Sequence, residues 1–254
     1  MLSSLGFLVT VLAFQTPVVQ TANGLRAPGK TPPSDVTKNL TPEMRGDIFV
    51  ARKMYREAIE TYQEGPKDSP VIANKIGIAY HQLLDLDAAK KWYERAVKLK
   101  PDYAEAINNI GTIYYAHKSY RRAISQYRRA LRVTPDSASI LSNLGMAYFE
   151  RKDYKDAFEL WQKAREIDPE VFEHHSSFGV LLQERTVDDR AKLHYLWAKM
   201  YAKAGQVELA IQYIRKSLEE GFKDRGKYTS EPEFSILKDN TEFKQLMAQD
   251  QKVL

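Results

Sequence analysis

Residues 104–135 read AEAINNIGTIYYAHKSYRRAISQYRRALRVTP, and their pattern is the main evidence for the fold. Its apolar residues recur at the spacing of amphipathic helices, first at Ile107, Ile110 and Tyr114 and then at Ala123, Tyr127 and Ala130. Side chains three and four residues apart lie on one face of a helix. Pro135 ends the second segment, because proline cannot continue a helix. The stretch therefore predicts two short helices joined by a turn.

The same pattern recurs at intervals of 34 residues. Six positions agree in three successive units, namely Gly77, Gly111 and Gly145; Tyr80, Tyr114 and Tyr148; Ala89, Ala123 and Ala157; Tyr93, Tyr127 and Trp161; Ala96, Ala130 and Ala164; and Pro101, Pro135 and Pro169. Gly111, Ala123 and Ala130 are small where the two helices would cross, and the ring of Tyr127 is expected to fill the space beside them. One helix pair cannot bury its apolar face alone, so the pairs are expected to stack into a solenoid.

These six positions resemble the tetratricopeptide repeat (TPR), a family of helix–turn–helix units. The resemblance covers about residues 39–221 and implies an all-α fold, a right-handed α-α superhelix of about five helix pairs. A solenoid needs its last apolar face covered. The residues expected to do this, in a C-terminal helical cap, are Phe234, Leu237, Phe243 and Leu246.

The sequence predicts six segments. Residues 39–171 are expected to hold about four repeats, and residues 191–221 a further TPR-like helix pair. Between them, residues 172–190 are either an irregular insert or part of a degenerate repeat. The remaining segments are a signal peptide or hydrophobic anchor at 1–22, a flexible linker at 23–38 and a C-terminal cap and tail at 222–254.

The N-terminal segment predicts export. From Leu2 to Phe14 the chain is almost wholly apolar. This run falls short of the about 20 apolar residues that span a bilayer, and it is typical of the core of a secretory signal with a cut after Ala22. We therefore expect an exported protein, periplasmic or secreted. The alternative is a protein anchored to the membrane by an uncleaved segment.

The sequence offers little for catalysis. The chain has no cysteine, which excludes disulfides, thiol catalysis and thiolate zinc sites, and its five histidines have no spacing typical of metal ligands. Residues 24–31 match GxxxxGK[ST] formally. Pro32 and Pro33 follow at once and remove the N–H donors that a phosphate-binding helix start supplies. We expect a protein that is not an enzyme and has no cofactor or metal.

The resemblance implies that the first helix of each pair lines a concave groove for a protein or peptide partner. Carried over by position, the groove residues are Asn74, Lys75, Ile78, His81, Asn108, Asn109, Thr112, Tyr115, Asn143, Met146 and Phe149. Amides can pair with an extended peptide backbone, and Tyr115, Met146 and Phe149 can accept an apolar side chain. The alternative is that the asparagines serve the scaffold itself. A clamp for chaperone C-termini is not expected, because only Asn109 matches its pattern.

A basic stretch suggests a second kind of surface. Six cations and no acid lie along residues 118–132, namely Lys118, Arg121, Arg122, Arg128, Arg129 and Arg132. They fall mostly on the outer face of a second helix, where they predict an electrostatic adaptor for an acidic partner or an anionic surface. A solvated convex face is the simpler interpretation. The net charge of +5 is small for a nucleic-acid binder, so no nucleic acid is expected, and membrane contact is expected only if the N-terminal segment is retained.

Overall fold

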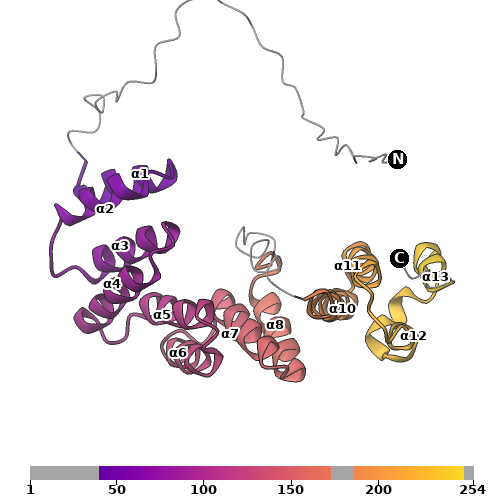
Figure 1. The fold of residues 1–254 in the computed structure, drawn as a ribbon. Coiled ribbons are helices and arrows are strands. Elements are labelled where there is room, and N and C mark those ends of the chain that lie inside the picture. The colour runs from indigo at the N-terminus through magenta and orange to yellow at the C-terminus, as the bar shows by residue number, and fades with distance from the viewer. Residues whose placement is uncertain (1–39, 173–185, 249–254) are drawn as a thin grey trace, which may run out of the picture. The chain divides into compact units, whose positions relative to one another are not determined.

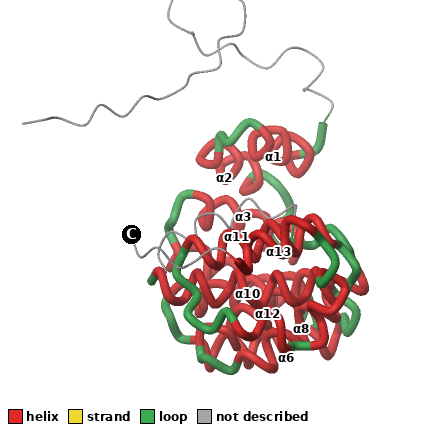
Figure 2. The backbone as a smooth tube through the Cα atoms, turned by 90° about the vertical axis from the view of Figure 1, so that its right-hand side faces the viewer, coloured by secondary structure: helices red, strands yellow, loops and turns green. Residues whose placement is uncertain are grey.

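The computed structural model describes residues 40–172 and 186–248, and every regular element in these two ranges is a helix (Figures 1 and 2). The predicted signal or anchor segment and the linker lie outside the described residues, as do the GxxxxGK[ST] match and most of residues 172–190. Export and the nature of the 172–190 segment therefore stay predictions.

The described helices follow one another as antiparallel pairs. In chain order they are α1 (Pro42–Ala51), α2 (Tyr55–Gln63), α3 (Pro70–Gln82), α4 (Leu86–Leu99), α5 (Ala104–Ala116), α6 (Tyr120–Val133), α7 (Ala138–Glu150), α8 (Tyr154–Ile167), α10 (Val187–Lys203), α11 (Val207–Glu219), α12 (Gly226–Ser230), the 3-10 helix η2 (Pro232–Leu237) and α13 (Thr241–Ala248). The closest packing is within the pairs α1/α2, α3/α4, α5/α6, α7/α8 and α10/α11, and each pair also contacts the next one. The predicted all-α solenoid of stacked helix pairs is confirmed.

A glycine and an aromatic ring set the close approach of the helices within each repeat. A Cβ atom added to Gly111 would lie 2.6 Å from Tyr127 Cε1, and one added to Gly77 would lie 2.6 Å from Tyr93 Cδ1. Real Cβ atoms are not found at such distances, so only glycine fits there. Gly46 and Gly145 stand in the same relation to Tyr62 and Trp161. The rings are buried, as the sequence predicts for Tyr127.

The turn within each pair has one repeated geometry. In the α5–α6 turn the Ser119 N–H donates to the Tyr114 carbonyl at 2.8 Å, and the Lys118 N–H donates to the Tyr115 carbonyl at 2.8 Å. This is the Schellman pattern of a helix that ends in a residue with positive φ. The residues with positive φ at these turns are Lys53, Leu84, Lys118, Lys152 and Gly205. The same local bonds thus reverse the chain in all five described pairs.

The C-terminal elements cover the last pair. Phe234 and Leu237 of η2 and Phe243 and Leu246 of α13 are buried, and they belong to the same apolar cluster as α10 and α11. Tyr195 of α10 adds a polar link, because its hydroxyl donates to Glu231 Oε2 at 2.5 Å. The predicted C-terminal cap is confirmed.

Candidate interaction surfaces

The asparagines of the predicted groove form one hydrogen-bonded ladder across three repeats. Asn143 Nδ2 of α7 donates to Asn108 Oδ1 of α5 at 3.0 Å, and Asn109 Nδ2 of α5 donates to Asn74 Oδ1 of α3 at 3.0 Å. A longer bond of 3.4 Å, from Asn108 Nδ2 to Asn109 Oδ1, joins the two halves. The four amides therefore link successive repeats, which is the scaffold role named above as the alternative.

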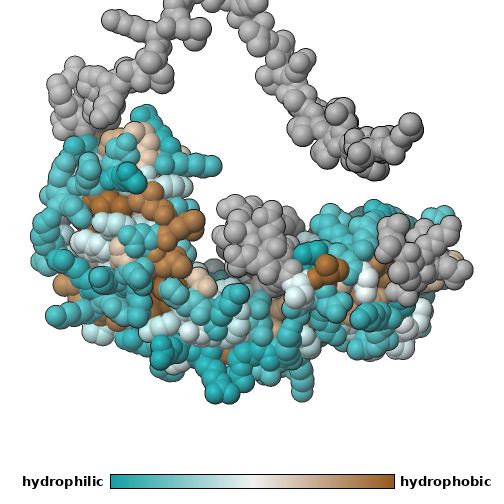
Figure 3. Space-filling view, in the orientation of Figure 1, coloured by the Kyte–Doolittle hydropathy of each residue, from teal (hydrophilic) through white to brown (hydrophobic). Residues whose placement is uncertain are grey.

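A hollow of about 340 Å³ opens beside this ladder. Its lining residues come from α3, α5, α7 and the connection before α7, and they are Asn74, Ile78, Ala104, Glu105, Asn108, Asn109, Thr134, Ser137, Ser139 and Ile140. Each amide has two N–H donors and an oxygen with two lone pairs, so the hydrogen bonds of the ladder leave further donors and acceptors for a ligand. Figure 3 shows a mostly hydrophilic surface on which apolar side chains gather over α3, the helix that carries Ile78. The hollow thus combines fixed amides with a small apolar patch.

Lys75, a predicted groove residue, is engaged within the protein. Its Nζ donates to Glu43 Oε1 and to Asp47 Oδ2 of α1, each at 2.7 Å. Burial lowers the pKa of Lys75, but the hydrogen bonds to Asp47 and Glu43 outweigh it and raise the pKa above its usual value. Because Tyr62 also donates to Asp47, at 2.7 Å, Lys75 belongs to a polar cluster that joins α1, α2 and α3.

Met146 and Phe149 do not line an open groove, and this prediction is wrong. They are only 3% and 1% exposed and belong to the core cluster that includes α10. The ring of Phe149 lies 5.9 Å from that of Trp161. Ten of the 13 residues of α7 are buried, so α7 has core on more than one face and its groove-side apolar residues become packing residues.

The other predicted groove residues are half-buried and make local contacts. The Thr112 hydroxyl donates to the Asn108 carbonyl at 3.3 Å and accepts from the Tyr127 hydroxyl at 3.4 Å. The Tyr115 hydroxyl donates to Glu150 Oε1 at 3.1 Å. Burial lowers the pKa of His81, whose Nδ1 lies 3.4 Å from the Tyr93 hydroxyl. These three residues stabilise the repeats and lie outside the lining of the hollow.

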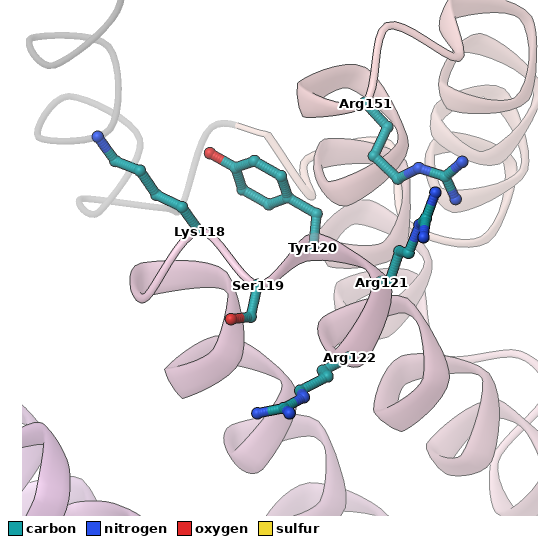
Figure 4. A pocket seen from close by; sticks show the side chains of 6 residues that line it. All are labelled: Lys118, Ser119, Tyr120, Arg121, Arg122 and Arg151. Carbon is teal, nitrogen blue, oxygen red and sulfur yellow. The ribbon is translucent and has the colours of Figure 1, made fainter.

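The basic residues of α6 border two further hollows, and one lining residue, Arg151, lies outside the predicted basic stretch. A hollow of about 530 Å³ is lined by Lys118, Ser119, Tyr120, Arg121, Arg122 and Arg151 (Figure 4). A second, of about 430 Å³, is lined by Arg121, Ile124, Ser125, Arg128, Arg129, Arg132 and Arg151. Arg151 follows α7 and lies 19 residues beyond the basic stretch in sequence. Only the stacking of α7 and α8 on α6 brings it to this surface.

Three of the six predicted basic residues also have structural partners. The guanidinium of Arg122 lies over the Tyr114 ring, 5.8 Å from its centroid. Arg128 donates to the Tyr148 hydroxyl and its guanidinium lies over that ring, 5.6 Å from the centroid. Arg129 Nη2 donates to the Pro101 carbonyl at 2.9 Å. Among the described residues, no carboxylate forms an ion pair with any of the six, namely Lys118, Arg121, Arg122, Arg128, Arg129 and Arg132. Within the described residues, the charges of these six side chains are therefore not offset by an ion pair, whereas Arg151 pairs with Asp153.

Two kinds of feature are absent from the described ranges. Residues 40–172 and 186–248 contain no group of three or more His, Asp or Glu side chains placed to hold a metal ion. No helix in the same ranges has both the length and the apolar character that a membrane crossing requires.

Comparison with known proteins identifies the repeats. Residues 68–136 and 108–171 match two family models, each described as a tetratricopeptide repeat. The recognition from sequence is confirmed for residues 68–171, which contain tetratricopeptide repeats. Such repeats are in general non-catalytic modules for protein–protein interaction, so the match supports an interaction scaffold.

Several solved structures are similar in fold. A crystal structure of MamA is 20% identical, with a TM-score of 0.48 and coverage of 69% of this chain and 93% of that one. MamA from Desulfovibrio magneticus RS-1 is 20% identical, with a TM-score of 0.48 and coverage of 70% and 92%. The first TPR of Spaghetti (RPAP3), bound to the HSP90 peptide SRMEEVD, is 25% identical, with a TM-score of 0.41 and coverage of 44% and 92%. A search of curated proteins finds no match.

Proposed function

We propose that this protein is a non-catalytic scaffold that holds an extended segment of a partner protein in the hollow beside α3, α5 and α7. The observation that carries the proposal is the amide ladder along the rim of that hollow. The ladder fixes each amide in one orientation. Binding of a ligand to the remaining donors and acceptors therefore costs little side-chain conformational entropy.

The lining favours an extended backbone over a folded surface. Asn108 and Asn109 offer donors and acceptors to the alternating N–H and C=O groups of a peptide. Ile78 and Ile140 lie among the same lining residues and accept one small apolar side chain. Glu105 is the only charged residue in the lining, so the hollow is suited to a segment with few acidic groups.

Site-specific photo-crosslinking tests the groove. A benzoylphenylalanine at Ser139, an exposed residue of the lining, is expected to crosslink the partner in the native organism, whereas one at exposed Lys91 of α4 is not. The change N108A/N109A removes two amides, each worth about 1 kcal/mol, and should reduce the Ser139 crosslink about thirtyfold. Thermal unfolding checks that the double variant is folded. Equal crosslinking from Lys91, or a Ser139 crosslink unaffected by N108A/N109A, would exclude the groove.

The basic surface of α6 supports a second candidate function, an electrostatic adaptor for an acidic partner or an anionic surface. The observation in its favour is that two hollows meet at Arg121 and Arg151, of which Arg151 has one exposed carboxylate partner, Asp153. Binding through this surface is expected to weaken steeply with salt, because exposed charges are screened. It should also survive N108A/N109A, which leaves the basic surface intact.

A further inference from the structure

We infer that the basic surface is a clamp for an acidic, extended polypeptide segment, in which Arg121 and Arg151 bind one carboxylate between them. This inference rests on the second candidate function and names its partner. The two arginines come from different helix pairs, Arg121 from α6 and Arg151 from the turn between α7 and α8. The clamp therefore exists only in the folded array.

The geometry of the two arginines favours an anion between them. Figure 4 shows the head groups of Arg121 and Arg151 pointing toward one another. Both residues line both hollows, so they stand where the two hollows meet. Two facing guanidinium groups repel each other unless an anion lies between them, and a carboxylate matches their planar donors.

The protein supplies little negative charge of its own here. Residues 118–132 contain no acid. The carboxylate of Asp153 lies 3.5 Å from Arg151 Nη2, but both side chains are more than a third exposed, so this ion pair is weak. The donors of Arg121 and most of those of Arg151 are therefore available to a ligand.

The shape of the surface selects an extended chain. Arg121, Arg128 and Arg132 lie seven and four residues apart, on one face of α6, and span about 16 Å at 1.5 Å per residue. An extended chain covers that length with about five residues. Its alternate side chains point to the same side, so acids at every second position would meet the row of arginines.

A membrane fits this surface less well. A helix that lies in a bilayer interface buries large apolar side chains next to its cations. None of the exposed large apolar residues of the described ranges lies within 118–132, and the nearest is Val133. The surface is also hollowed, whereas a bilayer presents a plane. A single acidic chain can enter the hollows.

Fluorescence anisotropy with a labelled octapeptide of alternating glutamate and serine tests the clamp on the full chain. The glutamine–serine octapeptide is the ligand control. We expect R121Q/R151Q to weaken binding at least about tenfold, because each charge-assisted pair is among the stronger hydrogen bonds. The matched control K91Q/K98Q removes the same charge from exposed positions of α4 and should change binding less than about twofold.

A conservative variant and a second ligand separate the outcomes. R151K keeps the charge and loses the planar fork, so its affinity should fall between wild type and R121Q/R151Q. The clamp is overturned if K91Q/K98Q weakens binding as much as R121Q/R151Q. It is also overturned if the octapeptide fails to bind while vesicles of equal parts phosphatidylcholine and phosphatidylserine bind and lose affinity in R121Q/R151Q. That last result would leave the electrostatic adaptor standing, whereas failure of both ligands would remove it as well.

Discussion

The helix pairs from α3 to α8 and the last pair, α10 with α11, use different residues where their two helices pack closely. In the repeats a glycine faces a large ring, as Gly111 faces Tyr127. At the corresponding positions of the last pair stand Ala198 and Ile214, both buried in one cluster. A larger residue on one helix is matched by a smaller one on the other. Contact of the helices therefore depends on the summed volume of the two positions.

The two regions also differ in how polar groups are used. The repeats present amides along one wall, where they link three helices and border an open hollow. In the last pair, charged side chains contact one another. Glu220, the C-cap of α11, accepts a hydrogen bond from Arg190 Nε at 2.9 Å, and its carboxylate lies 2.7 Å from His194 Nδ1. The cap then covers the apolar face. The repeats are thus built to leave a surface available and the last pair is built to close the array.

The largest expected effect is on the closing end. Phe234 is 1% exposed, and its ring lies 5.1 Å from that of Tyr228. Phe234→Ala should destabilise the cap by about 3–5 kcal/mol through the lost transfer energy and the cavity left behind. Hydrogen exchange should then show loss of protection in α10, η2 and α13 and little change in α3 and α4, because a solenoid unit contacts only its neighbours.

The control for this change is Ile236→Ala on the same short helix, at a position 51% exposed, which should alter stability by less than about 0.5 kcal/mol. Equal loss of protection in α3 and α10 after Phe234→Ala would show that the array unfolds as one unit and that the two regions are not separable.

The next largest effect is expected when a repeat is given the packing residues of the last pair. Gly111→Ala should cost about 1–3 kcal/mol, because its Cβ would overlap the ring of Tyr127. The double variant G111A/Y127I recreates the alanine–isoleucine combination of the last pair, with Ala198 and Ile214. A double-mutant cycle by urea unfolding should therefore give a double variant less destabilised than the sum of its singles. Additive costs would contradict the matched-volume account.

The smallest effect is on pH dependence. Burial lowers the pKa of His81 in the repeats and of His194 in the last pair, although Glu220 opposes the shift at His194. Both histidines are held neutral in the native state, so below about pH 6.5 the unfolded chain binds more protons and acid favours unfolding. This stability is complete above pH 6.5 and declines as the pH falls.

Urea unfolding between pH 7 and 5 should show a smaller decline in His81→Gln than in wild type. Glu220→Gln should make the decline steeper, since it removes the group that favours the charged form of His194. A decline unchanged in both variants would mean that other groups govern the acid response.

The sequence predicted the fold well because its signals are local or periodic. The 34-residue spacing of Gly77, Gly111 and Gly145 predicted the close helix contacts. In the structure each glycine lies beside the aromatic ring of its own repeat. The cap was also predictable, because its apolar residues come after the last repeat and have no other face to cover.

The candidate surfaces were only half predictable. Position within a repeat placed Asn108 and Asn109 on the hollow, but Met146 and Phe149, at other positions of the predicted groove, are buried. Whether such a residue is exposed depends on what packs against its helix, and α7 belongs to the cluster that includes α10. Arg151 was missed for the same reason, since its neighbour Arg121 lies on another helix pair.

The stacking of paired helices could be predicted from the order of residues alone. Spacing of apolar residues, small residues and prolines acts within one or two turns of helix, and all of it can be read along the chain. The packing of one repeat on the next sets which polar side chains hydrogen-bond to one another and which remain available to a partner. Those pairings join residues about one repeat apart, such as Asn143 and Asn108, and they depend on how each pair of helices is set against the next.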